Sequence, residues 1–356
     1  MKKYADKINI IFVIVYVALF AGCFIMQDVY SVVAKFASLI TFLLLALIAF
    51  VKFEKIDSEL VLVVAGCFVA GINLLIIHSN KGAFFTAADL LLMLYVTGRI
   101  QFKKKHKLIM AGAGSFILLF WYATVRWDYN FNMAGLVFMI TTISCMLFFE
   151  LLKDKYYYLK YMQILIFIVG VLFCTLYHSR CAMMGLIIFG IIYLAEPFIL
   201  KHSWMKYLLI ILSTVGAVLF TLLYVGIAKT GWNLTFLYKD ILSGRQLIWD
   251  ELWQALLKQP FTGIGSSYEL KSFFIFEVHN GLFDILAVHG VLVFAVTIVL
   301  LIKKLNMYLN TKAESNEYRI AVASVFAILF TSFFENFFIV SPYLLVVMML
   351  MNNQEE

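Results

Sequence analysis

The chain has 356 residues, of which 64% are hydrophobic and 14% are charged, and its mean hydropathy is +0.96. Soluble domains are about half apolar and about a quarter charged, so this composition excludes a soluble fold. It predicts an all-α protein that crosses a lipid bilayer several times. The net charge of +7 could suggest a nucleic-acid partner, but the distribution of basic residues along the chain accounts for it, and we expect no such partner.

Twelve apolar runs follow one another, each close to the ~20 residues that a helix needs to cross a bilayer. They lie at 8–26, 32–51, 60–77, 83–98, 107–123, 134–152, 162–177, 182–200, 206–227, 280–302, 318–335 and 336–351. Short connections join them, except for one long segment at 228–279. No linker rich in Pro, Gly or Ser divides the chain. We therefore expect a single polytopic domain over 1–356 with one large loop at 228–279.

Basic residues accumulate in the cytoplasmic connections of membrane proteins, and this bias predicts the orientation. With the N-terminus inside, the inner segments contain 19 of the 28 Lys and Arg residues and the outer segments contain 9. Both termini are then cytoplasmic and the loop at 228–279 faces outward.

The long loop contains the stretch "SGRQLIWDELWQALLKQP", which has the pattern of an amphipathic helix. Ser243 and Gln246 have the spacing of a capping box that begins a helix, and Pro260 marks its end. Trp249 and Trp253 would suit an anchor at the membrane interface.

Three basic or polar positions at the outer face are candidates for chemistry. Arg245 falls in the first turn of the loop helix, where unpaired backbone N–H groups and a guanidinium together form an anion site suited to phosphate. Arg180 opens a span at the outer face, against the charge bias, and charges at such positions tend to be functional. His279 precedes the tenth span, where an imidazole could accept a proton from a hydroxyl.

Each of these residues also has a simpler interpretation. An arginine at a span end can extend to lipid headgroups, and an interfacial histidine can be a polar anchor. Asp89 and Glu335 lie in or next to apolar runs, where an unpaired acid is costly, and each could pair with an arginine. We assign Ser243, Asn280 and Glu335, with the two arginines, to a substrate-binding set. No metal-ligand spacing or glycine-rich phosphate loop occurs, so we expect neither a metal nor a cofactor.

In chain order, "SR" opens a span, "SGR" with a following W, P and G-x-G lies in the long loop, and "HN" enters the next span. This order resembles the O-antigen polymerase and O-antigen ligase superfamily of bacterial membrane glycosyltransferases, the Wzy and WaaL-like proteins. The motifs cover roughly 175–295. The resemblance implies a GT-C-like fold in the bacterial cytoplasmic membrane, with the active site facing outward.

The resemblance also implies the reaction, in which a glycan moves from undecaprenyl diphosphate to a sugar hydroxyl without a metal. Arg180 and Arg245 would bind the diphosphate, and His279 would be the third catalytic residue. We favour a polymerase of lipid-linked repeat units of a capsule, exopolysaccharide or O-antigen over a ligase that transfers the chain to a lipid A core. A flippase and a chain-length regulator would be partners. A polysaccharide flippase is the alternative from another class, and a purely structural protein leaves the outer arginines unexplained.

Overall fold

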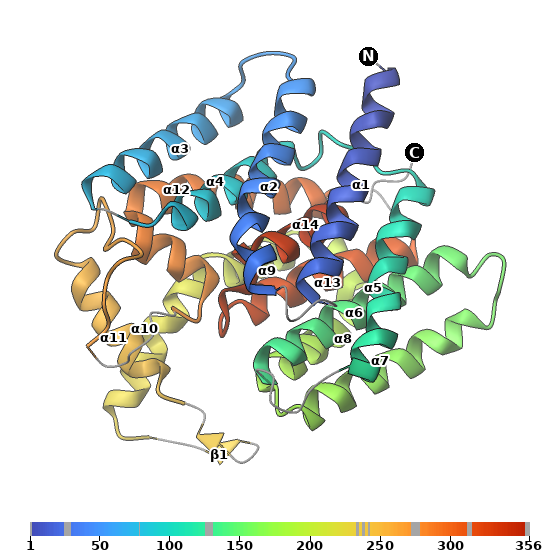
Figure 1. The fold of residues 1–356 in the computed structure, drawn as a ribbon. Helices are drawn as coiled ribbons and strands as arrows, with labels where there is room; N and C mark the ends of the chain where they lie inside the picture. Colours follow the sequence, from blue (N-terminus) through green and yellow to red (C-terminus); the bar gives the residue numbers. More distant parts are fainter. Residues whose placement is uncertain are drawn as a thin grey trace.

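The structure, a computed structural model, describes residues 2–24, 30–77, 79–124, 131–232, 235–236, 239–240, 243–271, 278–311 and 315–352. Within these residues it is helical apart from one short hairpin (Figure 1). The elements are α1 (Lys2–Phe24), α2 (Tyr30–Val51), α3 (Ser58–Ile76), α4 (Lys81–Val96), α5 (Lys104–Thr124), α6 (Phe131–Leu152), α7 (Leu159–Leu176), α8 (Arg180–Lys201), α9 (Ser203–Ser213), α10 (Val215–Lys229), β1 (Thr235–Phe236), β2 (Lys239–Asp240), α11 (Arg245–Leu256), α12 (Gly281–Leu309), α13 (Asn316–Thr331), the 3-10 helix η2 (Asn336–Ile339) and α14 (Ser341–Met351).

Each predicted apolar run contains a helix, which confirms a helical protein with several membrane helices. Among the described residues, α3, α6, α7, α8 and α12 are long and apolar enough to cross a bilayer. The pair α9 and α10 makes a sixth if it counts as one span. The last run holds η2 and the 11-residue α14, which is ~16 Å long and shorter than the ~30 Å hydrocarbon core. The count of twelve spans therefore stays a prediction.

The ninth run was expected to be one helix, but the structure divides it into α9 and α10, which are bent by 56°. The break is at Thr214, whose φ of −109° and ψ of −87° are not helical. The hydroxyl of Thr214 donates to the carbonyl of Ile210 at 2.7 Å, and the hydroxyl of Ser213 donates to the same carbonyl at 3.1 Å. Side-chain bonds of this kind compete with the helical backbone pattern and bend helices.

The C-terminal helices α13 and α14 form the centre of the bundle. Nearly every described residue in them is buried, and α13 packs against α8 and α6. By contrast, α7 exposes large apolar side chains such as Ile164, Leu172 and Leu176 along its length. A helix that is buried on all sides is central, and an apolar helix that stays exposed in the isolated chain faces lipid. In Figure 1, the red helices accordingly lie among the others and α7 lies at the edge.

Helix α12 is interrupted at Gly290, which has φ 80° and ψ 176°. The segment after α11 fills this interruption, because the amide of Val291 donates to the carbonyl of Pro260 at 2.8 Å and the amide of Ile264 donates to the carbonyl of Ala287 at 2.8 Å. A Cβ on Gly290 would lie 2.3 Å from the carbonyl oxygen of Phe261. Only glycine fits both this φ and this approach, so the loop segment is fixed to the interior of α12.

Helix α11 is amphipathic, as predicted, but Trp249 lies inside the protein. Trp249 is completely buried, and its indole Nε1 donates to the carbonyl of Val278 at 2.6 Å. The indole of Trp253, which is partly buried, donates to the hydroxyl of Thr221 at 2.9 Å. The predicted interfacial anchor is therefore wrong for Trp249. A buried indole needs a partner for its N–H, and here the partners are parts of the bundle, so the tryptophans hold α11 against α10 and α12.

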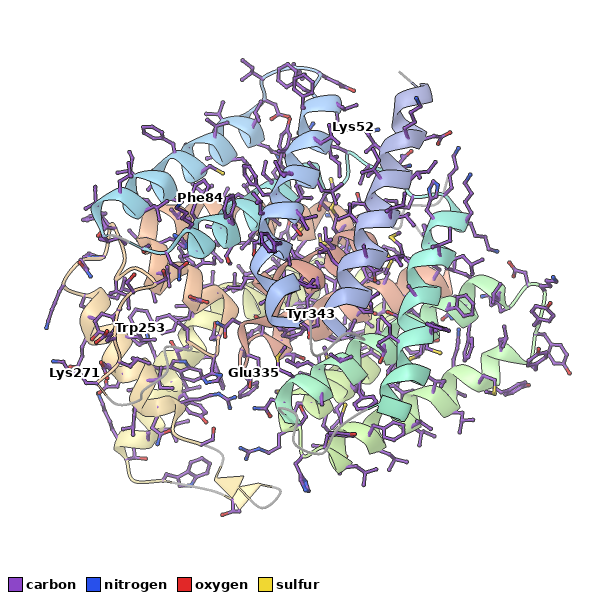
Figure 2. The ribbon with its side chains drawn as sticks, viewed as in Figure 1. Lys52, Phe84, Trp253, Lys271, Glu335 and Tyr343 are labelled. Carbon is purple, nitrogen blue, oxygen red and sulfur yellow. The ribbon has the colours of Figure 1, made fainter. Side chains whose placement is uncertain are left out.

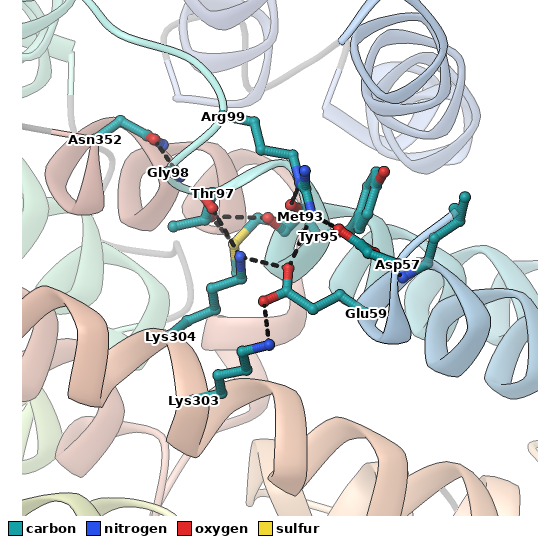
Figure 3. A network of polar contacts seen from close by, with 11 residues as sticks. Asp57, Glu59, Met93, Tyr95, Thr97, Gly98, Arg99, Lys303, Lys304 and Asn352 are labelled. Atoms are coloured by element: carbon teal, nitrogen blue, oxygen red, sulfur yellow. Dashed lines mark hydrogen bonds and ion pairs between the residues drawn. The ribbon is translucent and has the colours of Figure 1, made fainter. Parts of the chain in front are cut away.

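A group of charged side chains, which we call the inner network, joins α3, α4 and α12 (Figure 3). It consists of Asp57, Glu59, Arg99, Lys303 and Lys304. The carboxylate of Glu59 accepts from Lys303 at 2.9 Å, from Lys304 at 2.8 Å and from Arg99 at 3.2 Å. Asp57 caps α3 by accepting from the amide of Leu60 at 2.8 Å, and it also pairs with Arg99. These basic residues belong to segments that the charge bias places inside.

Candidate functional site

Arg245 is the first residue of α11, and its side chain is directed into the protein. The predicted capping box is wrong, because Gly244 is the N-cap, with φ 86°, and no side chain caps the helix. The hydroxyl of Ser243 instead accepts from Nη1 of Arg245 at 3.3 Å. The side chain of Arg245 is only 15% exposed. A guanidinium is thus held at a helix N-terminus, where backbone N–H groups add to its positive potential.

His279 and Asn280 precede α12 and have different roles in the structure. Asn280 is fully buried and caps α12 by accepting from the amide of Phe283 at 2.9 Å. Its Nδ2 donates to the carbonyls of Ala217 at 2.8 Å and Phe333 at 3.3 Å. Asn280 therefore holds the start of α12 in place, and this geometry gives no support to its predicted contact with substrate.

Glu335, which is labelled in Figure 2, connects two of the predicted motif residues, Arg245 and His279. Its Oε1 accepts from Nη2 of Arg245 at 2.7 Å, and its Oε2 lies 3.1 Å from Nδ1 of His279. The side chains of Glu335 and His279 are 13% and 21% exposed. Nδ2 of Asn132, at the start of α6, also donates to Glu335 Oε1 at 3.3 Å. One carboxylate thus orients a guanidinium and an imidazole that come from distant parts of the chain.

The position of Glu335 follows from the break between α13 and η2. Helix α13 ends at Thr331, and after a turn at 332–334 Glu335 has extended backbone, with φ −149° and ψ 145°, just before η2. The next residue, Asn336, donates to Oδ2 of Asp284 on α12 at 2.9 Å. The amide of Gly281 donates to the carbonyl of Ser332 at 3.0 Å, and a Cβ on Gly281 would lie 2.3 Å from the hydroxyl of Ser332. The start of α12 and the end of α13 are therefore closely joined.

Arg180 is the first residue of α8. The hydroxyl of Ser179, the residue before it, donates to the carbonyl of Asn132 at 3.4 Å, and Nδ2 of Asn132 donates to Glu335. The start of α8 is therefore joined to Glu335 through Asn132. We call Arg180, Arg245, His279 and Glu335 the outer cluster, after the side of the membrane that the charge bias predicts for it.

Backbone strain marks the same three motifs. Among the described residues, the non-glycine residues with positive φ are His178 at 55°, Ser243 at 48° and His279 at 52°. Each lies within two residues of the start of α8, α11 or α12. Such conformations cost of order 1–3 kcal/mol and persist where the surrounding structure requires them, often at functional sites. Their coincidence with the three motifs favours a functional role for the outer cluster.

Three of the buried polar atoms that have no hydrogen-bond partner among the described residues belong to Arg245, to its neighbour Gln246 and to Ser332, which lies next to Gly281. They are Nε of Arg245, Oε1 of Gln246 and Oγ of Ser332. A buried polar group without a partner costs ~1–3 kcal/mol, so such groups need an explanation. An unpaired guanidinium N–H beside an occupied one is suited to donate to a further oxyanion. No group of three or more His, Cys, Asp and Glu side chains is arranged to hold a metal ion within the part of the chain that the structure describes.

Of the residues that the sequence singled out, Arg245 and His279 both contact Glu335, for which an arginine was one suggested partner. The role of Arg180 stays a prediction. Sequence reasoning missed the contact between Glu335 and His279. It also missed Asn132 on α6, which donates to Glu335, and Tyr224 on α10, whose ring centroid lies 4.9 Å from that of Trp249 on α11. An asparagine and a tyrosine at span ends are common in membrane proteins, so neither carried a distinguishing signal.

Comparison with known proteins bears on these motifs directly. Residues 165–298 match the family model described as O-antigen ligase. This confirms the resemblance to the O-antigen ligase and polymerase superfamily. The matched segment includes Arg180, Arg245 and His279, whereas Glu335 follows it. Comparisons with curated proteins and with solved structures found no match. Members of this family are glycosyltransferase-like membrane enzymes.

Proposed function

We propose that this O-antigen ligase family protein polymerises lipid-linked polysaccharide repeat units at the outer face of the bacterial cytoplasmic membrane. The donor would be an oligosaccharide on undecaprenyl diphosphate, and the acceptor would be a sugar hydroxyl of another unit. The observation that carries the proposal is the carboxylate of Glu335, which contacts both Arg245 and His279.

The outer cluster offers what this reaction needs. The bond between the anomeric carbon and the phosphate oxygen breaks, and its electron pair leaves with the diphosphate. Arg245 and Arg180 would neutralise that charge, and a guanidinium can do so through two parallel hydrogen bonds. The acceptor hydroxyl forms the new bond from the opposite side, which inverts the configuration of the anomeric carbon.

His279 would accept the proton of that hydroxyl. An ionised carboxylate is only an acceptor, so the 3.1 Å contact with Glu335 requires Nδ1 of His279 to be the donor. In the neutral imidazole the lone pair then lies on Nε2. Glu335 thus fixes both the ring orientation and the nitrogen that takes the proton, as carboxylate partners of functional histidines do.

The test is to give the purified protein lipid-diphosphate-linked repeat units as the only substrate, in the presence of EDTA. A polymerase lengthens them, because one unit serves as donor and the next as acceptor. Strict dependence on a divalent metal would contradict the role given to the arginines.

The second candidate function is that of a ligase, which the description of the matched family favours. A ligase leaves the repeat units unchanged until a lipid A core acceptor is added, and then forms one product per acceptor. A flippase would form no glycosidic bond in either assay.

A further inference from the structure

A polar pocket lies on the side of α11 that faces away from the bundle. It has a volume of about 570 Å³, within the ~300–1,000 Å³ of small-ligand sites. Asp250, Glu251 and Gln254 on α11 line one side, and Gln259, Tyr268 and Lys271 of the following segment line the other. We call it the outer pocket. It is separate from the outer cluster, because Trp249 and the other buried residues of α11 lie between the two.

The segment that closes the outer pocket is held against α11. Oε1 of Glu251 accepts from the hydroxyl of Tyr268 at 3.1 Å and from the amide of Lys271 at 2.8 Å. Between α11 and Tyr268, the backbone of Pro260 and Ile264 forms hydrogen bonds with α12 at its interruption. The two sides of the pocket are therefore fixed relative to each other, which reduces the ordering that a ligand would have to impose.

The acidic side chains of the outer pocket are matched in number by lysines and already have hydrogen-bond partners. Oδ1 of Asp250 accepts from Lys229 at 2.8 Å, and its Oδ2 accepts from Nε2 of Gln254 at 3.1 Å. Two acids, Asp250 and Glu251, face two lysines, Lys258 and Lys271, among the lining residues. A diphosphate would be repelled by Asp250 and Glu251. A cation would have to displace the partners that these two carboxylates already have, such as Lys229 and Tyr268. The lining as a whole has no net charge, and its amides, carboxylates and phenol both donate and accept hydrogen bonds. Such a lining suits a neutral ligand rich in hydroxyl groups.

We propose that the outer pocket binds an oligosaccharide, namely sugar units of the acceptor or growing chain that lie beyond the reacting sugar; this rests on the proposed function. Arg245 and Gln254 lie on opposite sides of α11 and nine residues apart, so ~14 Å of helix axis and the ~10 Å helix diameter separate them, which a chain of several sugar units can span. The side chain of Gln254 donates through Nε2 to Asp250, and its Oε1 would accept from a sugar hydroxyl. Tyr268 would contribute its ring and Gln259 a second amide.

The test is a binding measurement that needs no catalysis. The probe is a set of oligosaccharides made by partial hydrolysis of the producing cell's own surface polysaccharide, free of lipid and phosphate, titrated against the full-length protein in detergent. Gln254→Trp fills the pocket and should abolish binding. Gln254→Ala removes one amide and should weaken binding ~10-fold, which corresponds to ~1.4 kcal/mol. Leu257→Trp is the matched control, since Leu257 is 73% exposed and lies outside the lining.

The proposal predicts that Leu257→Trp and Arg245→Ala bind the oligosaccharides as the wild type does. It is overturned if the wild type does not bind them, or if Gln254→Trp binds them as tightly as the wild type. Its failure differs from failure of the proposed function. If Gln254→Trp has no effect but Arg245→Ala stops chain synthesis, only the pocket is wrong. If the pocket binds glycan but Arg245→Ala synthesises chains normally, the proposed reaction site is wrong.

Discussion

The inner network and the outer cluster are two groups of charged side chains at the two ends of α12. In the inner network, Glu59 accepts from three cations, and Arg99 also bonds to the carbonyl of Tyr95 and lies over its ring. In the outer cluster, one carboxylate serves both Arg245 and His279, and Nε of Arg245 has no partner among the described residues.

The backbone differs in the same way. Asp57 caps α3 from ordinary extended backbone, whereas Ser243 and His279 adopt left-handed conformations. A group whose charges are satisfied on relaxed backbone stabilises the fold, and a strained group with vacant donors is prepared for a ligand. The comparison therefore separates variants that should remove activity from variants that should remove stability.

The largest effect should come from His279→Ala. Removal of a general base typically costs ~100–10,000-fold in rate, so long chains should disappear while the protein keeps its normal abundance. His202→Ala is the matched control, because the ring of His202 contacts Phe198 at the α8–α9 junction. The chain-length distribution of the surface polysaccharide measures both. Normal chains in His279→Ala would remove His279 from the mechanism.

Glu335→Gln should have the next largest effect. The amide keeps the shape but no longer fixes both the guanidinium and the imidazole, and loss of such a partner typically costs ~10–100-fold in activity. Because Glu335 acts through the orientation of other groups, kcat should fall while KM for the acceptor stays nearly constant. Steady-state kinetics with purified protein would decide this. A change confined to KM would instead mean that Glu335 contacts the acceptor.

Glu59→Gln in the inner network should act on stability alone. The amide cannot neutralise Arg99, Lys303 and Lys304, and buried polar groups that lose their partners cost ~2 kcal/mol. The melting temperature should therefore fall, and activity per folded molecule should not. Thermal unfolding in detergent, followed by an assay of the folded fraction at low temperature, measures the two separately. Lost activity in folded Glu59→Gln would show that the inner network takes part in function.

The smallest effect should come from Asp57. Asp57→Ala removes the cap of α3 and should cost ~1 kcal/mol, whereas Asp57→Asn keeps a capping side chain and should cost less. The Leu60 amide and then the Arg99 guanidinium lower the pKa of the Asp57 carboxyl. The stability due to this shift is present above the usual carboxyl pKa and is lost as the pH falls through the lowered pKa. The gap between wild type and Asp57→Asn in pH-dependent unfolding should therefore close in acid; a constant gap would contradict this.

The sequence predicted the helices and the three motifs more reliably than the contacts between them. Apolar runs are local, so the positions of helices such as α3 and α8 followed directly. The partner of Arg245 is 90 residues away, and nothing local in "SFFENFF" indicates that Glu335 faces both an arginine and a histidine. Such contacts depend on the tertiary packing of α11, α12 and α13.

The wrong local predictions have local physical reasons. The capping box failed because Gly244 takes the left-handed position before α11 and the hydroxyl of Ser243 bonds to Arg245. The interfacial role of Trp249 failed because amphipathic spacing gives a buried face without saying whether protein or lipid covers it. Here the protein covers it.

The most direct test compares two arginines, each paired with an acid, one at either end of α12. Purified Arg245→Ala and Arg99→Ala would be assayed for extension of lipid-diphosphate-linked repeat units, with melting temperature measured in parallel. Arg245→Ala should lose ~100–1,000-fold in rate with little loss of stability, because it removes charge that the leaving diphosphate needs. Arg99→Ala should melt at lower temperature and keep its rate per folded molecule. Full activity in Arg245→Ala, or the opposite pattern in the two variants, would contradict the assignment of the outer cluster as the reaction site.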